Sequence, residues 1–249
     1  MIDTIMLGDA RALPLDDNSV HLVFTSPPYN VGMPYADDPT GDNMAFDDYL
    51  KFTREWMAEA KRVLVPGGRI CINVGNTGRD PYIPLNSYII RIALDELKLL
   101  MRQEFIWNKG DAVARGSTGW GSWKNASNPV MRDCHEYVEI FSKGTYQLDT
   151  SGFPPSDLSS KENSDFTVGL AHLSPDGKKY GHPASFPDAL ACRFIKLYTH
   201  PGMTVLDPFS GSGTTFRVAK SLGRHAVAFD RSPTYVEMGQ KQLGGNLFA

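Results

Sequence analysis

The chain has 249 residues, of which 41% are hydrophobic and 21% are charged, the balance of an ordinary globular protein that can bury a full core. Its formal net charge of -3 does not by itself indicate a nucleic-acid-binding protein. No apolar run approaches the roughly 18 residues of a membrane span, and no charged-then-apolar leader precedes the first expected strand. Three cysteines without paired spacing argue against a disulfide framework or a zinc site. We therefore expect a cytoplasmic protein without metal.

Taken in chain order, short apolar runs alternate with segments of helical periodicity. The runs predict strands at 4–7, 20–25, 69–74, 103–107, 137–141, 203–206 and 226–229, and the periodic segments predict helices at 47–64, 87–100, 186–198, 215–222 and 233–242. Strands joined by helices indicate an α/β fold, with a doubly wound, mainly parallel sheet covered on both faces. The apolar period is lost over 144–181, and 109–134 also lacks it, so we interpret both stretches as insertions that serve recognition.

A glycine-containing loop follows the strand expected at 203–206, and it reads Asp207-Pro208-Phe209-Ser210-Gly211-Ser212-Gly213-Thr214-Thr215. Gly211 and Gly213 permit a tight turn and a close approach of the backbone to a ligand. The loop is not a P-loop, and Phe216 breaks the dinucleotide-binding pattern. The next strand ends in Asp230, where a carboxylate can accept hydrogen bonds from ribose hydroxyls. The glycine loop and Asp230 together favour a ribose-bearing cofactor without a pyrophosphate. The alternative role of Asp230 is a helix cap.

A second loop, Thr25-Ser26-Pro27-Pro28-Tyr29-Asn30, follows the strand expected at 20–25. Consecutive prolines cannot continue a strand ladder, and they hold the backbone extended. One interpretation is a stiff turn with a core tyrosine. The chemical interpretation is that the Ser26 hydroxyl and the Pro27 carbonyl accept the two N–H groups of a nucleobase amino group while Tyr29 stacks on the base. The amino nitrogen can then point its lone pair at an electrophilic methyl group.

Both loops follow strands, and open α/β sheets bind ligands at the carboxyl ends of their strands. With the catalytic strand first and the glycine loop last, the chain resembles the S-adenosylmethionine-dependent DNA amino-methyltransferases of the permuted beta class, which act on cytosine N4 or adenine N6. The resemblance runs from about Thr4 to Gln242. It implies a circularly permuted, Rossmann-like methyltransferase sheet with a small target-recognition insertion. It also implies S-adenosyl-L-methionine as cofactor and double-stranded DNA as substrate, and leaves open a cognate restriction endonuclease and a monomer or homodimer.

The resemblance also assigns residues to roles. The catalytic set is Ser26, Pro27, Pro28 and Tyr29. The cofactor set draws on Gly8-Asp9-Ala10, on the glycine loop and on the segment from His182 to Pro187; it comprises Asp9, Ala10, Thr25, His182, Phe186, Asp207, Phe209, Ser210, Gly211, Gly213, Thr214 and Asp230. Phe105-Ile106-Trp107-Asn108-Lys109 resembles the segment whose aromatic residue helps to hold a flipped base. DNA contacts are expected at Trp107, Lys109, Arg115, Trp120, Trp123 and Lys124.

By the same resemblance, residues 1–143 form the catalytic half with a DNA-contacting loop at 109–134, residues 144–181 the target-recognition insertion, and residues 182–249 the cofactor-binding half. Ser-Pro-Pro-Tyr is typical of enzymes that methylate cytosine N4, whereas Asp-Pro-Pro-Tyr is typical of adenine N6 enzymes, so Ser26 favours N4-cytosine and N6-adenine is the alternative. Cytosine C5 methylation needs a nucleophilic thiolate, and no cysteine follows a proline in a loop. More distant alternatives are an RNA or protein-glutamine methyltransferase and a non-catalytic DNA-binding subunit.

Overall fold

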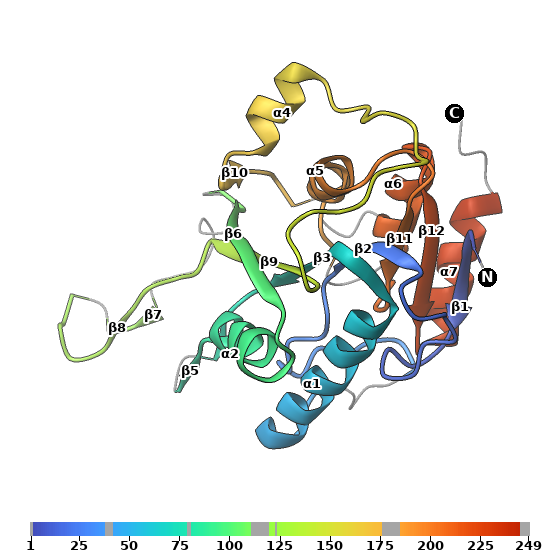
Figure 1. The fold of residues 1–249 in the computed structure, drawn as a ribbon. Helices are drawn as coiled ribbons and strands as arrows, with labels where there is room; N and C mark the ends of the chain where they lie inside the picture. The colour runs from blue at the N-terminus through green and yellow to red at the C-terminus, as the bar shows by residue number, and fades with distance from the viewer. Residues whose placement is uncertain are drawn as a thin grey trace.

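The computed structural model describes residues 2–37, 42–78, 81–110, 120–122, 124–175 and 185–244. An eight-stranded sheet runs through its centre in the order β1-β12-β11-β2-β3-β9-β6-β10 (Figure 1). Its strands are β1 (Thr4–Leu7), β2 (Val20–Thr25), β3 (Leu64–Val74), β6 (Leu100–Asn108), β9 (His135–Ser142), β10 (Leu170–His172), β11 (Thr204–Asp207) and β12 (His225–Asp230). In the described part of this sheet only β9 runs antiparallel to its neighbours. The predicted mainly parallel α/β sheet is confirmed.

Helices cover both faces of the sheet (Figure 1). They are α1 (Phe46–Val63), α2 (Leu85–Arg91), which continues into the π turn η1 (Ile92–Glu96), α4 (Ser160–Phe166), α5 (Asp188–Tyr198), α6 (Thr214–Ser221) and α7 (Pro233–Gly244). Successive residues of β2 alternate between two apolar clusters. Val23 packs in the cluster with Trp56 of α1, whereas Phe24 packs in the other with Phe194 of α5. Of the helices described, none is both long and apolar enough to cross a membrane.

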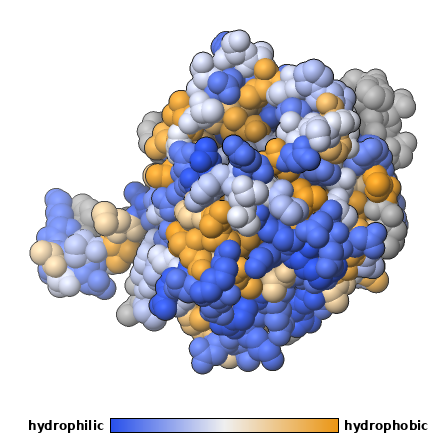
Figure 2. All heavy atoms as spheres, viewed as in Figure 1, coloured by the Kyte–Doolittle hydropathy of each residue, from blue (hydrophilic) through white to orange (hydrophobic). Residues whose placement is uncertain are grey.

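Two pairs of short strands lie outside the main sheet: β4 (Thr77–Gly78) with β5 (Tyr82–Ile83), and β7 (Trp120–Gly121) with β8 (Pro129–Val130). The second pair forms an arm that extends well away from the body of the molecule (Figure 1). Most of the visible surface of this arm is hydrophilic (Figure 2). An extended polar arm of this kind is available for contact with a partner, because it packs little against its own domain.

Two predicted helices had the wrong C-terminal ends, and two elements of the stretch 144–181 were not predicted. The helix expected at 47–64 ends at Val63, and β3 begins at Leu64 because this residue already pairs with Val20. The helix expected at 87–100 ends earlier, since Lys98 has a φ of +53° and Leu100 pairs with Ser142. The stretch 144–181 contains α4 and β10, neither of which was predicted.

These two elements gave no apolar signal for physical reasons. Helix α4 buries none of its residues and is held at its start by a reciprocal cap between Ser159 and Glu162. Strand β10 has three residues and adds to the edge of the sheet beside β6. A periodicity argument detects neither a helix without a buried residue nor an edge strand this short.

The direction of the strands determines where a site can form. Chain order reverses between β11 and β2, which are parallel neighbours in the middle of the sheet. Ligands bind in the crevice beyond the carboxyl ends of the strands at such a reversal. Because β9 runs the opposite way to β3 and β6, its first residues lie at the same edge as the last residues of those two strands.

The buried carboxyl group of Glu139 on β9 makes stability depend on pH. Burial raises its pKa to about 9, and the neighbouring Glu104 carboxyl adds to the rise. The unfolded chain releases this proton near pH 4.5, so between that pH and about 9 the folded state holds a proton that the unfolded state has lost. Stability from this group is therefore full at acid pH and is lost as the pH rises towards 9.

We expect the free energy of unfolding to fall between pH 7 and pH 9 by up to about 1.4 kcal/mol per pH unit from Glu139 alone. The Glu139→Gln variant cannot lose this proton, so its decline should be shallower. Urea unfolding of both proteins at pH 7, 8 and 9 measures the difference. Equal slopes in the two proteins would show that Glu139 titrates in the folded state as it does in the unfolded chain.

Candidate active site

A cavity of about 720 Å³ opens at the carboxyl edge of the sheet, on the side of the reversal between β11 and β2. This size lies within the range of small-molecule and cofactor sites. Twelve residues predicted from the sequence line it: Asp9, Ala10, Ser26, Pro27, Pro28, Tyr29, Trp107, Lys109, Phe186, Phe209, Gly211 and Asp230. The structure therefore brings the two loops, although far apart in the chain, to the wall of one cavity.

Five further predicted residues lie beneath the cavity instead of lining it: Thr25, Asp207, Ser210, Gly213 and Thr214. The Thr25 hydroxyl donates to Asp207 Oδ1 at 2.7 Å and so joins the end of β2 to the end of β11. Burial raises the pKa of Asp207 to about 6, against the lowering effect of that hydrogen bond. Gly213 has a φ of +80° at the start of α6, a conformation that favours glycine. These buried residues hold the glycine loop in its conformation without lining the cavity.

Of the remaining five predicted residues, only two lie in the part of the chain that the structure describes. His182, Arg115 and Trp123 lie outside the described residues. Trp120 belongs to β7, but its side chain is not among those described, and Lys124 lies in the same arm. Their assignment to cofactor or DNA contact stays a prediction.

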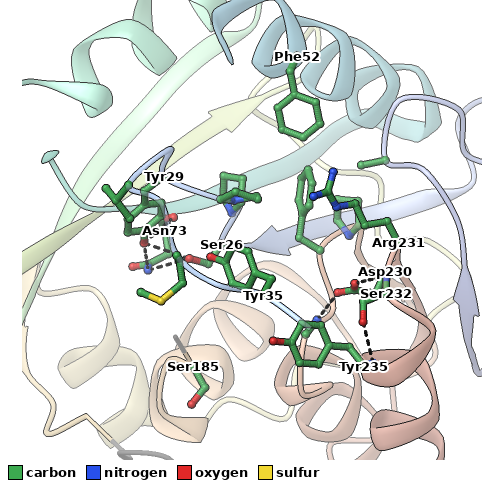
Figure 3. A pocket seen from close by; sticks show the side chains of 18 of the residues that line it. Ser26, Tyr29, Tyr35, Phe52, Asn73, Ser185, Asp230, Arg231, Ser232 and Tyr235 are labelled. Atoms are coloured by element: carbon green, nitrogen blue, oxygen red, sulfur yellow. Dashed lines mark hydrogen bonds between the residues drawn. The ribbon is translucent and has the colours of Figure 1, made fainter. Parts of the chain in front are cut away.

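The catalytic loop is held in a compact polar cluster at one end of the cavity (Figure 3). Ser26 Oγ lies 3.0 Å from Tyr29 Oη. Asn73, near the end of β3, points its amide nitrogen at both, 3.3 Å from Ser26 Oγ and 3.0 Å from Tyr29 Oη. The loop is fixed from the other side by the hydroxyl of Tyr49, which donates to the Pro28 carbonyl at 3.0 Å.

A carboxylate on β9 completes this cluster. Glu136 Oε2 accepts from Tyr29 Oη at 3.2 Å and from Asn73 Nδ2 at 2.6 Å. Its other oxygen pairs with the ammonium group of Lys109, which also lies 4.8 Å from the centre of the Trp107 ring. Burial, and then the charge of Glu136, raise the pKa of Tyr29 well above its ordinary value. The phenol therefore stays protonated and can donate a hydrogen bond.

The other end of the cavity is built around Asp230 at the end of β12 (Figure 3). Its carboxylate accepts from the backbone N–H of Gly211 at 2.8 Å and of Ser232 at 2.9 Å. Burial raises the pKa of Asp230. Asp230 thus organises the glycine loop and the start of α7, while it also faces the cavity. Both roles considered for this residue, cap and cavity carboxylate, are compatible with this geometry.

The loop that follows Tyr29 contributes Val31, Met33 and Tyr35 to the cavity wall. The buried carboxylate of Asp42 accepts from the backbone N–H groups of Asn30, Val31 and Met33 at 2.7 to 3.1 Å. Asp37 accepts from the Ser232 hydroxyl and from the backbone and hydroxyl of Thr234, at 2.6 to 3.0 Å. Tyr35 lies between the catalytic cluster and Asp230 (Figure 3). Asp42 thus holds the start of this loop in place, and Asp37 joins the loop to the beginning of α7.

Sequence reasoning missed several residues of the cavity wall, among them Tyr35, Phe52, Asn73, Glu136, Arg231, Ser232 and Tyr235. Two of them carried a signal. Asn73 is a polar residue inside the apolar run of β3, and Glu136 immediately precedes the apolar run expected at 137–141. Polar residues at the ends of buried strands are candidates for a site even without a motif.

Comparisons with known proteins agree with this geometry. A family model described as DNA methylase, for N6 and N4 methyltransferases, matches residues 20–241. The chain is 32% identical over 238 residues to the type II methyltransferase M.HpaI of Haemophilus parainfluenzae, covering 92% of this chain and 69% of that protein. The chain belongs to the N6/N4 DNA methylase family.

Solved structures share the fold. TTHA0409 of Thermus thermophilus, described as a DNA modification methylase, is 27% identical to this chain. The TM-score is 0.75, and the match covers 97% of this chain and 94% of that one. A second structure of TTHA0409, in complex with S-adenosyl-L-methionine, matches with the same identity, TM-score and coverage. The PvuII DNA methyltransferase, described as cytosine-N4-specific, has a TM-score of 0.72 at 23% identity, over 95% of this chain and 84% of that chain; this likeness concerns the fold.

Membership of this methylase family makes the protein an S-adenosylmethionine-dependent DNA methyltransferase. The described residues suit that cofactor. A carboxylate that faces the cavity, Asp230, suits the ribose hydroxyls, and the neighbouring ring of Phe209 offers an apolar surface for a nucleobase. A Cβ atom at Gly8 would lie only 2.8 Å from the Phe229 ring. Glycine at this position therefore lets the backbone before Asp9 lie close to β12.

Proposed function

We propose that this methylase transfers a methyl group to the exocyclic N4 of a cytosine flipped out of duplex DNA. The observation that carries the proposal is Ser26, whose side chain lies at the wall of the cavity directly before Pro27, Pro28 and Tyr29. Ser-Pro-Pro-Tyr is the form of this loop that is typical of N4-cytosine enzymes. A base reaches such a cavity only after leaving the helical stack.

The residues of the chain act by positioning and electrostatics. S-adenosylmethionine, when bound, supplies an electrophilic methyl group on a sulfonium sulfur. The Ser26 hydroxyl and the Pro27 carbonyl accept the two N–H groups of the cytosine amino group, so that its lone pair turns out of the ring plane. Tyr29 supports the face of the base. As the amino nitrogen bonds to the methyl carbon, the bond from that carbon to the sulfonium sulfur breaks, and the extra proton on the nitrogen passes to solvent. No side chain of the protein is alkylated in this scheme.

Methylation of adenine N6 is the second candidate, and one observation favours it. Glu136 places a carboxylate two hydrogen bonds away from Ser26, through Tyr29. The cluster thus contains the negative charge that an aspartate in the position of Ser26 would bring in an Asp-Pro-Pro-Tyr enzyme. The combined charge of Ser26 and Glu136 is therefore closer to that of an Asp-Pro-Pro-Tyr loop than the charge of Ser26 alone.

Nucleoside analysis separates the two candidates. The protein is expressed in a host that lacks its own DNA methyltransferases, and the DNA is digested and analysed by mass spectrometry. We expect N4-methyldeoxycytidine, and none from cells that express the Ser26→Ala variant. N6-methyldeoxyadenosine without methylated cytosine would overturn the assignment from Ser26, and 5-methyldeoxycytidine would overturn the amino-transfer scheme as well.

We also propose that duplex DNA is contacted by the arm of β7 and β8 and by the insertion 144–181, with residues 1–143 forming the catalytic half and 182–249 the cofactor half. The arm contains Lys124 and extends from the edge of the molecule that bears the cavity-lining end of β6 (Figure 1). Trp107 and Lys109 lie in the cavity wall, so their contact would be with the flipped base. Phosphate contacts elsewhere on the duplex need basic residues on one face only.

A further inference from the structure

Glu136 occupies an unusual position for a charged residue in this molecule. Its side chain is only 13% exposed, lies in the wall of the cavity and interacts with three groups: the Tyr29 hydroxyl, the Asn73 amide and the Lys109 ammonium. No motif in the sequence contains it. It reaches this place because β9 is antiparallel, which brings the beginning of that strand beside the end of β3, where Asn73 lies.

The chemistry of these groups determines which of them donate hydrogen bonds and which accept. A serine or tyrosine hydroxyl donates one hydrogen bond and can also accept, whereas a carboxylate only accepts. The Tyr29 hydroxyl has two acceptor-only neighbours on this side, Glu136 Oε2 at 3.2 Å and the Asn73 backbone carbonyl at 3.3 Å, of which only Glu136 is charged. The Tyr29 proton therefore points to this side, and the carboxylate is its stronger acceptor. The Tyr29 oxygen is then left to accept, so the Ser26 hydroxyl donates its single proton to Tyr29 across their 3.0 Å contact.

This direction matters at Ser26. With its proton turned towards Tyr29, the Ser26 oxygen presents only lone pairs to the cavity. An amino group that offers two N–H donors then meets an acceptor, never a competing hydroxyl proton. An aspartate at this position would be an acceptor without any help, whereas a serine needs a neighbour to orient it.

We propose that Glu136 is a positioning residue for methyl transfer, which acts through Tyr29 to fix the Ser26 hydroxyl as an acceptor for the target amino group. The inference rests on the proposed role of Ser26, and it holds whether the amino group belongs to cytosine or to adenine. Asn73 supports the same arrangement, since its amide nitrogen donates to Glu136 and lies within reach of both hydroxyls.

The test is the Glu136→Gln variant of the full chain. Glutamine has the same size, but its amide can donate a hydrogen bond to the Tyr29 oxygen. The Tyr29 hydroxyl can then donate to Ser26, which reverses the direction of the hydrogen bonds between Glu136 and Ser26. We expect the single-turnover rate on unmethylated genomic DNA, measured with labelled S-adenosylmethionine, to fall by about 10- to 100-fold, the effect of one hydrogen bond to a charged group. Cofactor affinity should change by less than about 3-fold, because Glu136 bonds to Tyr29 and Asn73. These two residues lie at the other end of the cavity from Asp230 (Figure 3).

A double-mutant cycle gives the readout that a merely structural role would not produce. Tyr29→Phe removes the hydroxyl that connects Glu136 to Ser26. We expect Glu136→Gln to cost little further rate in the Tyr29→Phe background, so that the two losses do not multiply. Independent, multiplicative losses would overturn the proposal, as would a wild-type rate in the Glu136→Gln protein.

Two controls separate the possible failures. Glu139→Gln makes the same chemical change on the same strand but outside the cavity wall, and should keep the wild-type rate. A wild-type rate in Ser26→Ala would overturn the role of Ser26 itself, whereas a slow Ser26→Ala with an unaffected Glu136→Gln would overturn only the role of Glu136. If Glu136→Gln does not fold, Tyr29→Phe alone decides, since a wild-type rate in that variant also overturns the proposal.

Discussion

Replacing Tyr29 with alanine should slow the methyl-transfer step by about 100-fold or more, while the affinity for DNA changes by less than about 3-fold. Stacking of a base on an aromatic ring contributes about 1–3 kcal/mol, and it acts here only after the base has left the helix. The same substitution removes the hydroxyl that lies 3.0 Å from Ser26 Oγ. Rapid-quench single-turnover kinetics measure the rate, and fluorescence anisotropy of labelled DNA measures the affinity.

The Tyr29→Phe variant is the matched control, because it keeps the ring and loses only the hydroxyl. Its rate should lie between those of the wild type and Tyr29→Ala. If Tyr29→Ala and Tyr29→Phe were equally slow, the ring would contribute nothing by stacking. A loss of DNA affinity as large as the loss of rate would place Tyr29 in the initial complex with the duplex.

Asp230→Ala should weaken S-adenosylmethionine binding by about 1.5–3 kcal/mol, the range for hydrogen bonds to a charged group. Two effects combine in this loss. The carboxylate facing the cavity disappears, and the backbone N–H groups of Gly211 and Ser232 lose their acceptor. Isothermal titration calorimetry with the cofactor measures the change. DNA affinity should stay close to that of the wild type, and the variant should stay folded with a lowered thermal midpoint.

Asp230→Asn helps to separate the two effects, since an asparagine oxygen can still accept from one of these N–H groups. We expect it to bind the cofactor better than Asp230→Ala but less tightly than the wild type. Wild-type affinity in Asp230→Ala would remove this residue from the cofactor site.

The parts of the site that follow parallel strands could be predicted from the sequence. A loop after a buried apolar run lies at the carboxyl edge of such a sheet, so Ser26 and Asp230 could be placed near one cavity without knowledge of any contact. Glu136 could not be placed in this way. It begins its strand instead of ending it, and only the antiparallel direction of β9, which no local pattern reveals, brings it to that edge.

Asn73 illustrates a second limit. It lies inside β3, where an apolar neighbourhood predicts burial, and its amide is buried as expected. What the pattern does not reveal is the partner, because the distance from Asn73 to Tyr29 depends on how β2 and β3 pair. Helix α4 illustrates a third limit. Its sequence carries a cap signal at Ser159, but the helix has no buried apolar face, so hydrophobic periodicity does not predict it.

The hydrogen bond between Thr25 and Asp207 joins residues 182 positions apart, and this separation has a consequence for biosynthesis. Strand β11 lies between β2 and β12, so a nascent chain that ends before residue 204 lacks the neighbour that β2 needs on that side. The catalytic loop at residues 25–30 leaves the ribosome well before β11 and β12, yet its cavity cannot be assembled without these two strands. Residues 204–230 must therefore be translated before the cavity can form, and chains truncated before β11 should be inert.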